Sequence, residues 1–174
     1  MDDITALYTA YLLSSFLEVT ATGLSSVLDE RISHDKITRY LKACKTGGKA
    51  LWMAVKLFVK QYRSDDACLI FDDTIIEKSR REEDACNTWH YNPTNGQTVK
   101  GINLVNCLYH STNKKGTLRC PVSYRQVKKT IHYCELATKK EKQRSPFTKN
   151  EMFRDMFDQA LHNQLSFRHV LADS

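Results

Sequence analysis

The stretch ACLIFDDTIIEKS, residues 67–79, places two adjacent acids inside an apolar run. Its apolar and β-branched content predicts a strand, and successive residues of a strand point to opposite faces of a sheet. One of the two carboxylates, Asp72 or Asp73, must therefore point to the side that buries Leu69 and Phe71. A carboxylate on that side is costly unless a cation meets it, so we expect a basic side chain or a metal ion there.

The rest of the second half predicts a mixed sheet with a helix crossing it. Strands are expected at 98–111 and 117–129, joined by the hairpin sequence NKKG. A capping-box pattern, Thr-x-x-Glu at 148–151, opens a helix, and the segment 167–174 follows as a last strand that carries Asp173. Three strands, a crossover helix and a fourth strand indicate an α/β (α+β) fold.

Charge is unevenly distributed along the chain. The net charge is +6, and residues 98–144 contain eleven Lys or Arg against two acids. Such a segment suits a phosphate-bearing partner, although a solvated face with a lysine-rich loop at 137–144 explains the same composition. The polar, acidic segment 77–89 also predicts a loop.

Residues 1–66 predict a helical domain. Apolar residues recur at helical spacing from Ile4 to Phe16, and further helices are expected at 24–30, 33–44 and 49–62. This half has no strand pattern, so the chain divides into a helical part and a part built on a sheet.

Two of these helices have the proportions of a helix-turn-helix motif. In that motif the second helix, here 33–44 after 24–30, lies in the major groove of DNA. Its polar face would offer Lys36, Arg39 and Lys42 to double-stranded DNA. A plain helical hairpin with a solvated basic face fits the pattern equally well.

The cellular compartment is inferred from targeting and membrane-span patterns that the sequence does not show. The start, MDDITALY, has no basic region and no small-residue cleavage site, which argues against a signal peptide. The six cysteines stand alone, as expected for a reduced compartment, and no apolar run is long enough for a membrane span. These features favour a cytoplasmic protein of bacterial type, associated with the nucleoid.

The first and last strands share a pattern, an apolar run followed by aspartate: Asp73 in the first and Asp173 in the last. If these strands are neighbours, the two carboxylates meet and repel each other unless protons or cations intervene. Hard oxygen ligands suit Mg²⁺ or Mn²⁺. Two such ions, about 4 Å apart, can activate a water or a 3′-hydroxyl and stabilise the leaving oxygen of a phosphodiester. The pair therefore predicts a metal site acting on nucleic acid.

Several blocks of the sequence, in order, resemble a DDE transposase of the IS4/IS701 (insertion-sequence) type. They are LIFDDTIIEKS at 69–79, WHYNPTNGQTVKGINLVNCLYH at 89–110 and VLADS at 170–174. The upstream block TATGLSSVLDERISHDKITRYL, 20–41, is similar to the N-terminal DNA-binding segment of such enzymes. The resemblance covers roughly residues 20–174 and implies a ribonuclease-H-like fold and DNA transposition.

The resemblance also implies roles for individual residues. The first catalytic aspartate of the family closes the first strand directly before a threonine, which corresponds to Asp73 and leaves Asp72 as a solvent-facing neighbour. The second closes the fourth strand, which corresponds to Asp173. Both would be catalytic metal ligands. His90 and Lys100 lie in a matching block, as phosphate contacts or as parts of the loop structure.

One part of the family pattern is missing from these residues. The family needs a third acid, a Glu in a Tyr-Arg-Glu-Lys signature on a helix beyond the second aspartate, whereas Glu151 precedes Asp173. We therefore expect residues 67–174 to be the N-terminal part of a truncated catalytic domain that binds metal weakly and does not transpose alone. The complete enzyme would be a candidate homodimer. Alternatives are a non-catalytic DNA-binding remnant that occupies element ends and an inert pseudogene product.

Overall fold

The computed structural model describes residues 4–15, 19–44 and 47–172. The chain forms two compact units, Met1–Lys45 and Thr46–Ser174. The sequence placed the boundary at residue 66 instead. The helix between the two positions, α4 (Gly48–Gln61), belongs to the second unit because its Val59 is buried in the core of the sheet.

The first unit is a small helical bundle. Its helices are α1 (Ile4–Ser14), α2 (Ala21–Val27) and α3 (His34–Ala43). They bury a common apolar cluster made of Ile4, Leu24, Ile32 and Ile37. Helix α3 begins as predicted, with the Ser33 side chain accepting a hydrogen bond from the backbone N–H of Lys36.

Helix α2 differs from the predicted helix at 24–30. It begins earlier because the Thr20 side chain caps it by accepting from the backbone N–H of Gly23 at 2.9 Å. It ends before Asp29 and Glu30, which both adopt a positive φ that a helix does not allow. The helix-turn-helix assignment of α2 and α3 stays a prediction.

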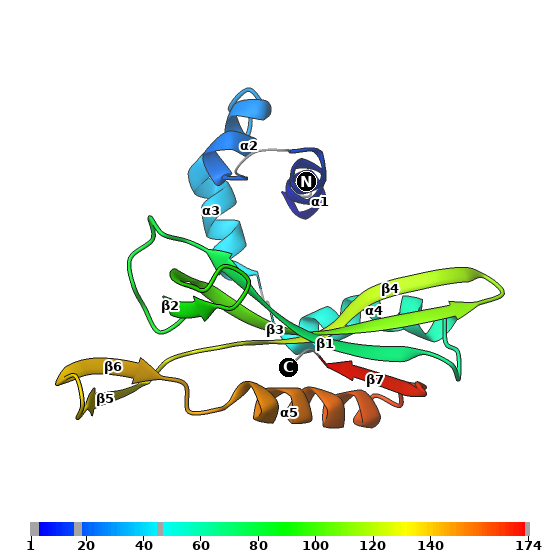
Figure 1. Ribbon diagram of the computed structural model, residues 1–174. Helices are drawn as coiled ribbons and strands as arrows, with labels where there is room; N and C mark the ends of the chain where they lie inside the picture. Colours follow the sequence, from blue (N-terminus) through cyan, green and yellow to red (C-terminus); the bar gives the residue numbers. More distant parts are fainter. Residues whose placement is uncertain (1–3, 16–18, 45–46, 173–174) are drawn as a thin grey trace. The chain divides into compact units, whose positions relative to one another are not determined.

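The second unit is built on a five-stranded mixed sheet (Figure 1). Its strands are β1 (Cys68–Glu77), β2 (Asn87–Asn92), β3 (Gln97–Asn113), β4 (Gly116–Gln126) and β7 (His169–Ala172). The order is β2-β3-β1-β7, and β4 also pairs with β3. All pairs are antiparallel except β1 with β7, which is parallel.

The predicted loops at 77–89 and 137–144 are confirmed only in part, since residues 78–86 and 137–139 lie outside strands and the rest of each segment is in a strand. The segment 77–89 contains the start of β2, in which Thr88 and His90 alternate with exposed Trp89 and Tyr91. The lysine-rich segment 137–144 supplies one strand of a separate hairpin. This hairpin joins β5 (Ile131–Glu135) to β6 (Lys140–Arg144).

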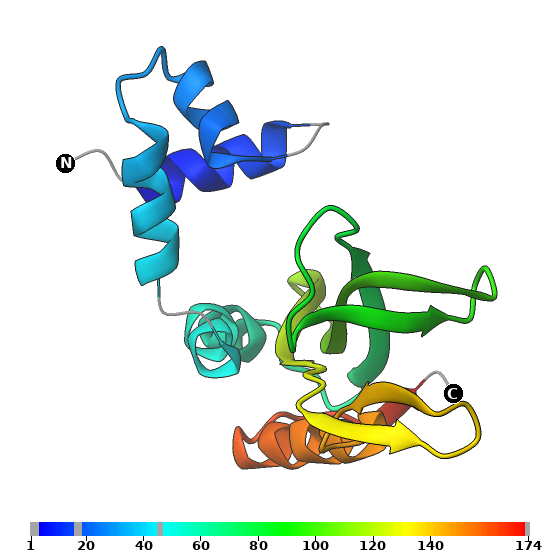
Figure 2. The ribbon, with the colours of Figure 1, turned by 90° about the vertical axis from the view of Figure 1, so that its left-hand side faces the viewer.

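One face of the sheet is covered by α4 and by α5 (Lys149–His162). Both helices lie on the same side of the sheet in Figure 2. The core joins strand residues of that face to residues of both helices: Leu69, Phe71, Val105, Cys107, Tyr109, Val59, Met152, Met156 and Ala160. Helix α5 connects the antiparallel strands to parallel β7, as the predicted crossover helix should. The arrangement is consistent with the predicted ribonuclease-H-like α+β fold.

The opposite face of the sheet carries Ile70, Asp72 and Ile76 from β1, because residues alternate along the strand. Ile76 is 41% exposed and Leu171 of β7 is 57% exposed. This face therefore presents apolar side chains to solvent. Among the described residues, no helix is long and apolar enough to cross a membrane.

Candidate active site

Asp73 lies in the interior of β1, not at its end as the resemblance implied. The strand continues to Glu77, because Thr74 and the two isoleucines after it keep pairing with β3. Asp73 is on the face of Leu69 and Phe71, towards α5, and is half-buried. The expectation that one carboxylate points to the buried side is confirmed.

A cation meets this carboxylate, and it is a lysine. The Lys149 ammonium lies 2.6 Å from Oδ2 of Asp73, and the Asn103 side-chain amide donates to the same oxygen at 3.3 Å. Charge-assisted hydrogen bonds of this kind are the stronger ones. The cost of placing a carboxylate on the covered face is thus offset by one positive charge and one amide donor.

Helix α5 holds Lys149 in place. Thr148 caps the helix in a full capping box with Glu151, so Lys149 occupies the first helical position. Four residues later the Phe153 ring packs on the Phe71 ring, with 5.5 Å between the ring centroids. The contact fixes the start of α5 over β1, two residues before Asp73 in the strand.

His90 of β2 is a buried neutral base near this ion pair. Burial lowers its pKa to about 4, and the charges of Lys129 and Lys149 act in the same direction, while Asp73 opposes them. Only 6% of His90 is exposed, and its Nε2 atom has no hydrogen-bond partner in the described part of the chain. The ring is therefore uncharged at neutral pH, with one buried nitrogen left as an unused acceptor.

A cavity of about 660 Å³ opens beside the two acids. The lining comes from three elements: Asp72, Asp73, Thr74 and Ile75 of β1, Asn92, Pro93 and Thr94 at the β2–β3 turn, and Lys149, Asn150 and Phe153 of α5. The cavity thus brings Asp73, the lysine and the first turn of α5 to one accessible place, with Asp72 at its edge. Asp72 is exposed, and its Oδ1 accepts a hydrogen bond from the backbone N–H of Asp73 at 2.7 Å.

The first and last strands are neighbours, which is the condition for bringing Asp73 and Asp173 together. Strand β7 runs parallel to β1, and the last described pair of this ladder joins Phe71 to Ala172. Asp173 itself lies outside the described residues.

The three predicted DNA-binding side chains, Lys36, Arg39 and Lys42, lie in α3 of the first unit and are all exposed. Ile37, between them in the sequence, is fully buried in the bundle. The helix thus keeps its apolar side inside and leaves the basic residues accessible.

These features can be compared with known proteins. The model of a family described as DDE superfamily endonuclease matches residues 3–174. The chain belongs to this DDE endonuclease family. No curated protein and no solved structure matches it. Membership supports a nuclease- or transposase-like function acting on DNA. Asp73 and the cavity beside it form the candidate active site for that function.

Sequence reasoning missed two residues of this candidate site, Lys149 and Asn103. The capping pattern located the start of α5, but it did not indicate that Lys149, the next residue, would face Asp73. Asn103 carried a signal only in retrospect, as a polar residue at an inward position of an otherwise apolar strand pattern.

Proposed function

We propose that the chain carries part of the active site of a DNA transposase of the IS4/IS701 type. In the complete protein this site cleaves and joins double-stranded DNA at insertion-sequence ends. The observation that carries the proposal is the half-buried Asp73 facing a cation, on a strand that lies beside the one leading to Asp173. Family membership supports the reaction class. The activity implies a location with the chromosome, in a bacterial-type cytoplasm.

The residues around Asp73 supply part of a ligand set for a divalent cation, since no group of three or more His, Cys, Asp or Glu in the described part of the chain is placed to hold one. Asp73 supplies a carboxylate oxygen, and the buried Oδ1 of Asn103, which lies on the same face, has no hydrogen-bond partner among the described residues. Such hard oxygen donors suit Mg²⁺ or Mn²⁺. When bound, the metal supplies Lewis-acid activation of a water or 3′-hydroxyl and of the scissile phosphate.

In this proposal Asp73 and Asp173 hold the metal, while other residues orient the DNA. Lys149 already lies at the cavity and can exchange its carboxylate partner for a DNA phosphate. A third carboxylate completes the metal site of this proposal, and without it residues 1–174 bind metal weakly and do not transpose. Two copies of the complete protein, one at each element end, are a suitable assembly.

The deciding experiment replaces each of two adjacent acids in a protein completed with a segment that supplies the third acid. Asp73→Asn should reduce Mg²⁺-dependent strand cleavage by at least about 10²-fold, because a metal ligand is lost, and should leave DNA binding intact. Asp72→Asn is the matched control, since it removes the same charge one residue away.

The outcomes separate the possibilities. Cleavage that survives Asp73→Asn rules out the role of Asp73. Loss of cleavage only in Asp72→Asn would assign the metal-binding role to Asp72 instead of Asp73. Asp72 directly follows Phe71, which forms the last described pair with Ala172 of β7. Survival in both variants removes the metal-site proposal.

A second candidate function is non-catalytic occupation of element ends. It is favoured by the ion pair between Lys149 and Asp73, which satisfies the carboxylate without a metal. Here DNA binding by Lys36, Arg39 and Lys42 would be the whole activity. Binding to end sequences that is unchanged by a metal chelator and falls steeply with salt would support it.

A further inference from the structure

The hairpin formed by β5 and β6 stands apart from the main sheet. Its strands pair only with each other, in a two-stranded sheet. In Figure 1 it extends from the end of the unit at which α5 begins. All of its strand residues are exposed except Glu135 and Gln143, which are half-buried. An isolated two-stranded hairpin is only marginally stable. Because few of its residues are buried, packing does not account for its residue composition.

The register of the hairpin separates its charges onto two faces. Paired residues share a face, and residues alternate along each strand. Tyr133 pairs with Lys142, and Ile131 with Arg144, so these lie on one face together with Lys140 and its partner Glu135. We call this the basic face.

The other face has a different character. It carries His132 and Gln143, which pair with each other, and Cys134 with Glu141. Glu141 and Gln143 line a cavity together with Trp89 of β2, and Lys142 of the basic face lines it too. Two residues of this face thus lie against the sheet, whereas Lys140 and Arg144 of the basic face do not line that cavity.

The acids do not cancel the charge of the basic face. Glu135, the acid on this face, is bound by the Lys142 ammonium at 2.6 Å and by the Thr138 hydroxyl at 2.5 Å. Glu141 lies on the opposite face, 2.8 Å from the His132 ring. Lys140 and Arg144 remain as exposed cations, and the Arg144 guanidinium lies 5.7 Å from the centre of the Tyr133 ring.

The spacing of the cations suits a phosphodiester backbone. Alternate residues of a strand are about 7 Å apart, so Lys140, Lys142 and Arg144 form a straight row on β6, in which Lys142 is paired with Glu135. That interval is close to the separation of adjacent phosphates along a nucleic-acid strand. Antiparallel β-ribbons are an established type of DNA-binding element.

We propose that the basic face of the β5–β6 hairpin binds the phosphate backbone of double-stranded DNA next to the candidate active site. The inference rests on the proposed function, since DNA has to reach that site. It adds a contact surface within the second unit, separate from the basic residues of α3.

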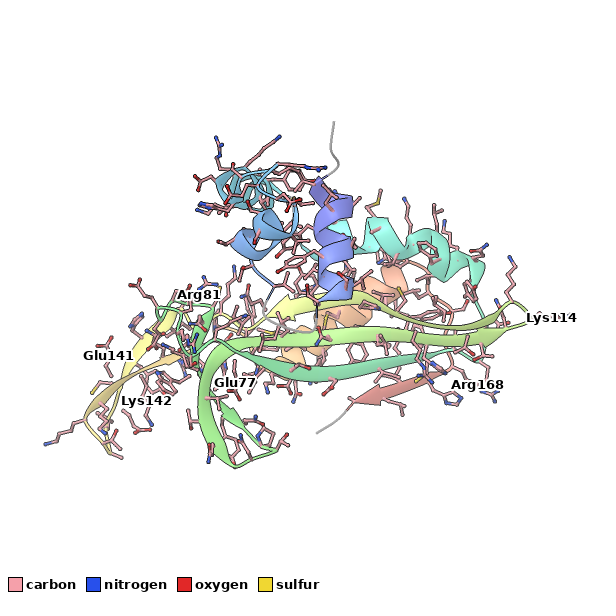
Figure 3. All side chains as sticks on the ribbon, turned by 90° about the horizontal axis from the view of Figure 1, so that it is seen from above. Glu77, Arg81, Lys114, Glu141, Lys142 and Arg168 are labelled. Carbon is pink, nitrogen blue, oxygen red and sulfur yellow. The ribbon has the colours of Figure 1, made fainter. Side chains whose placement is uncertain are left out.

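The first test measures binding of the full chain to a fluorescein-labelled DNA duplex of arbitrary sequence, in a metal chelator, at several salt concentrations. The variant K140Q/R144Q keeps the Lys142–Glu135 ion pair that joins the strands. Its matched control, K114Q/K115Q, removes the same charge from the β3–β4 turn. Figure 3 shows Lys114 and Lys142 at opposite ends of the unit.

K140Q/R144Q should bind about tenfold more weakly at low salt, and the slope of log K against log salt should be shallower by about 2. The control should bind within about twofold of the unchanged chain. Equal weakening in both variants would show that only total charge matters and would overturn the proposal. Unchanged binding in K140Q/R144Q would overturn it too.

Cross-linking separates a direct contact from a folding defect. A benzophenone side chain at position 133, on the basic face, should cross-link to the duplex, whereas the same group at position 132, on the other face, should not. Equal yields at the two positions would contradict the proposal. These readouts need no cleavage, so their failure leaves the metal site standing, whereas absence of any DNA binding by the unchanged chain would refute both proposals.

Discussion

The ion pair between Asp73 and Lys149 contributes little to stability. The two side chains remain 31% and 44% exposed, and ion pairs open to solvent contribute about 0–1 kcal/mol. The same openness lets a metal or a phosphate reach either partner. Its value to the molecule is therefore in keeping two opposite charges in place at an accessible cavity.

His90 makes the stability of the second unit sensitive to pH. Its folded pKa of about 4 lies below the ordinary histidine value of about 6.5. Between these values the unfolded chain binds a proton that the folded chain does not, so stability falls as the pH decreases through this window. At pH 5 the cost is about 1–2 kcal/mol.

Replacing His90 by glutamine should remove this contribution. Urea unfolding gives the free energy of unfolding of each protein at pH 7 and at pH 5. The decrease from pH 7 to pH 5 should be about 1–2 kcal/mol larger in the unchanged chain than in His90→Gln. Identical losses in the two proteins would show that His90 is not held neutral by its surroundings.

At the scale of elements, β1 and β3 approach each other unusually closely near the site. A Cβ added at Gly101 of β3 would lie 2.4 Å from the backbone oxygen of Ile76, and a backbone oxygen has little freedom to move. Gly101 is therefore required for the two strands to pair up to the end of β1.

Gly101→Ala should destabilise the second unit by more than about 2 kcal/mol, because the strands have to separate. Gly48→Ala is a suitable control. A Cβ at Gly48 would have the flexible Arg125 side chain as its nearest neighbour, at 3.3 Å, so its denaturation midpoint should stay close to that of the unchanged chain. Similar midpoints for both variants would contradict the steric argument.

Elements with a strong local pattern were predictable from the sequence, and elements that depend on distant partners were not. The apolar alternation of β1 and the cap of α5 are local signals, and both predictions are confirmed. Strand β2 was missed because its buried residues are polar. The side-chain amide nitrogen of Asn87, which is fully buried, donates to backbone carbonyls of Lys78, Arg81 and Glu82, and the sequence alone does not place these beside it.

The site shows the same division. The inward direction of Asp73 follows from alternation with Leu69 and Phe71, so the need for a cation was predictable. The identity of that cation was not, because Lys149 reaches Asp73 only once Phe153 has packed on Phe71. The basic face of the hairpin likewise depends on a register that composition does not reveal.

At the scale of the whole molecule, α4 and α5 cover one face of the sheet, and the other face has exposed apolar residues. Ile76 and Leu171 are among the exposed side chains of that face. Apolar patches of this kind promote association or aggregation. The isolated chain should therefore self-associate in a concentration-dependent way.

Replacing both residues by threonine, which strands accept well, should reduce this association. Sedimentation velocity at increasing protein concentration should show less oligomer for Ile76→Thr/Leu171→Thr than for the unchanged chain. The control Leu57→Thr/Leu161→Thr changes exposed leucines on the two helices and should leave association unaltered. Equal effects of the two pairs would mean that the sheet face is not the contact surface.

The adjacent acids of β1 give the strand a form of redundancy. A slip of its pairing by one residue exchanges the two faces of the strand. Asp72 would then point towards α5 in place of Asp73, while Leu69 and Phe71 would turn away from the core. An aspartate would face Lys149 in either pairing register. The two adjacent aspartates therefore do not favour the correct register over the shifted one. The apolar residues alone make that distinction, and a mutation at Phe71 could therefore change which aspartate serves the site without altering either aspartate.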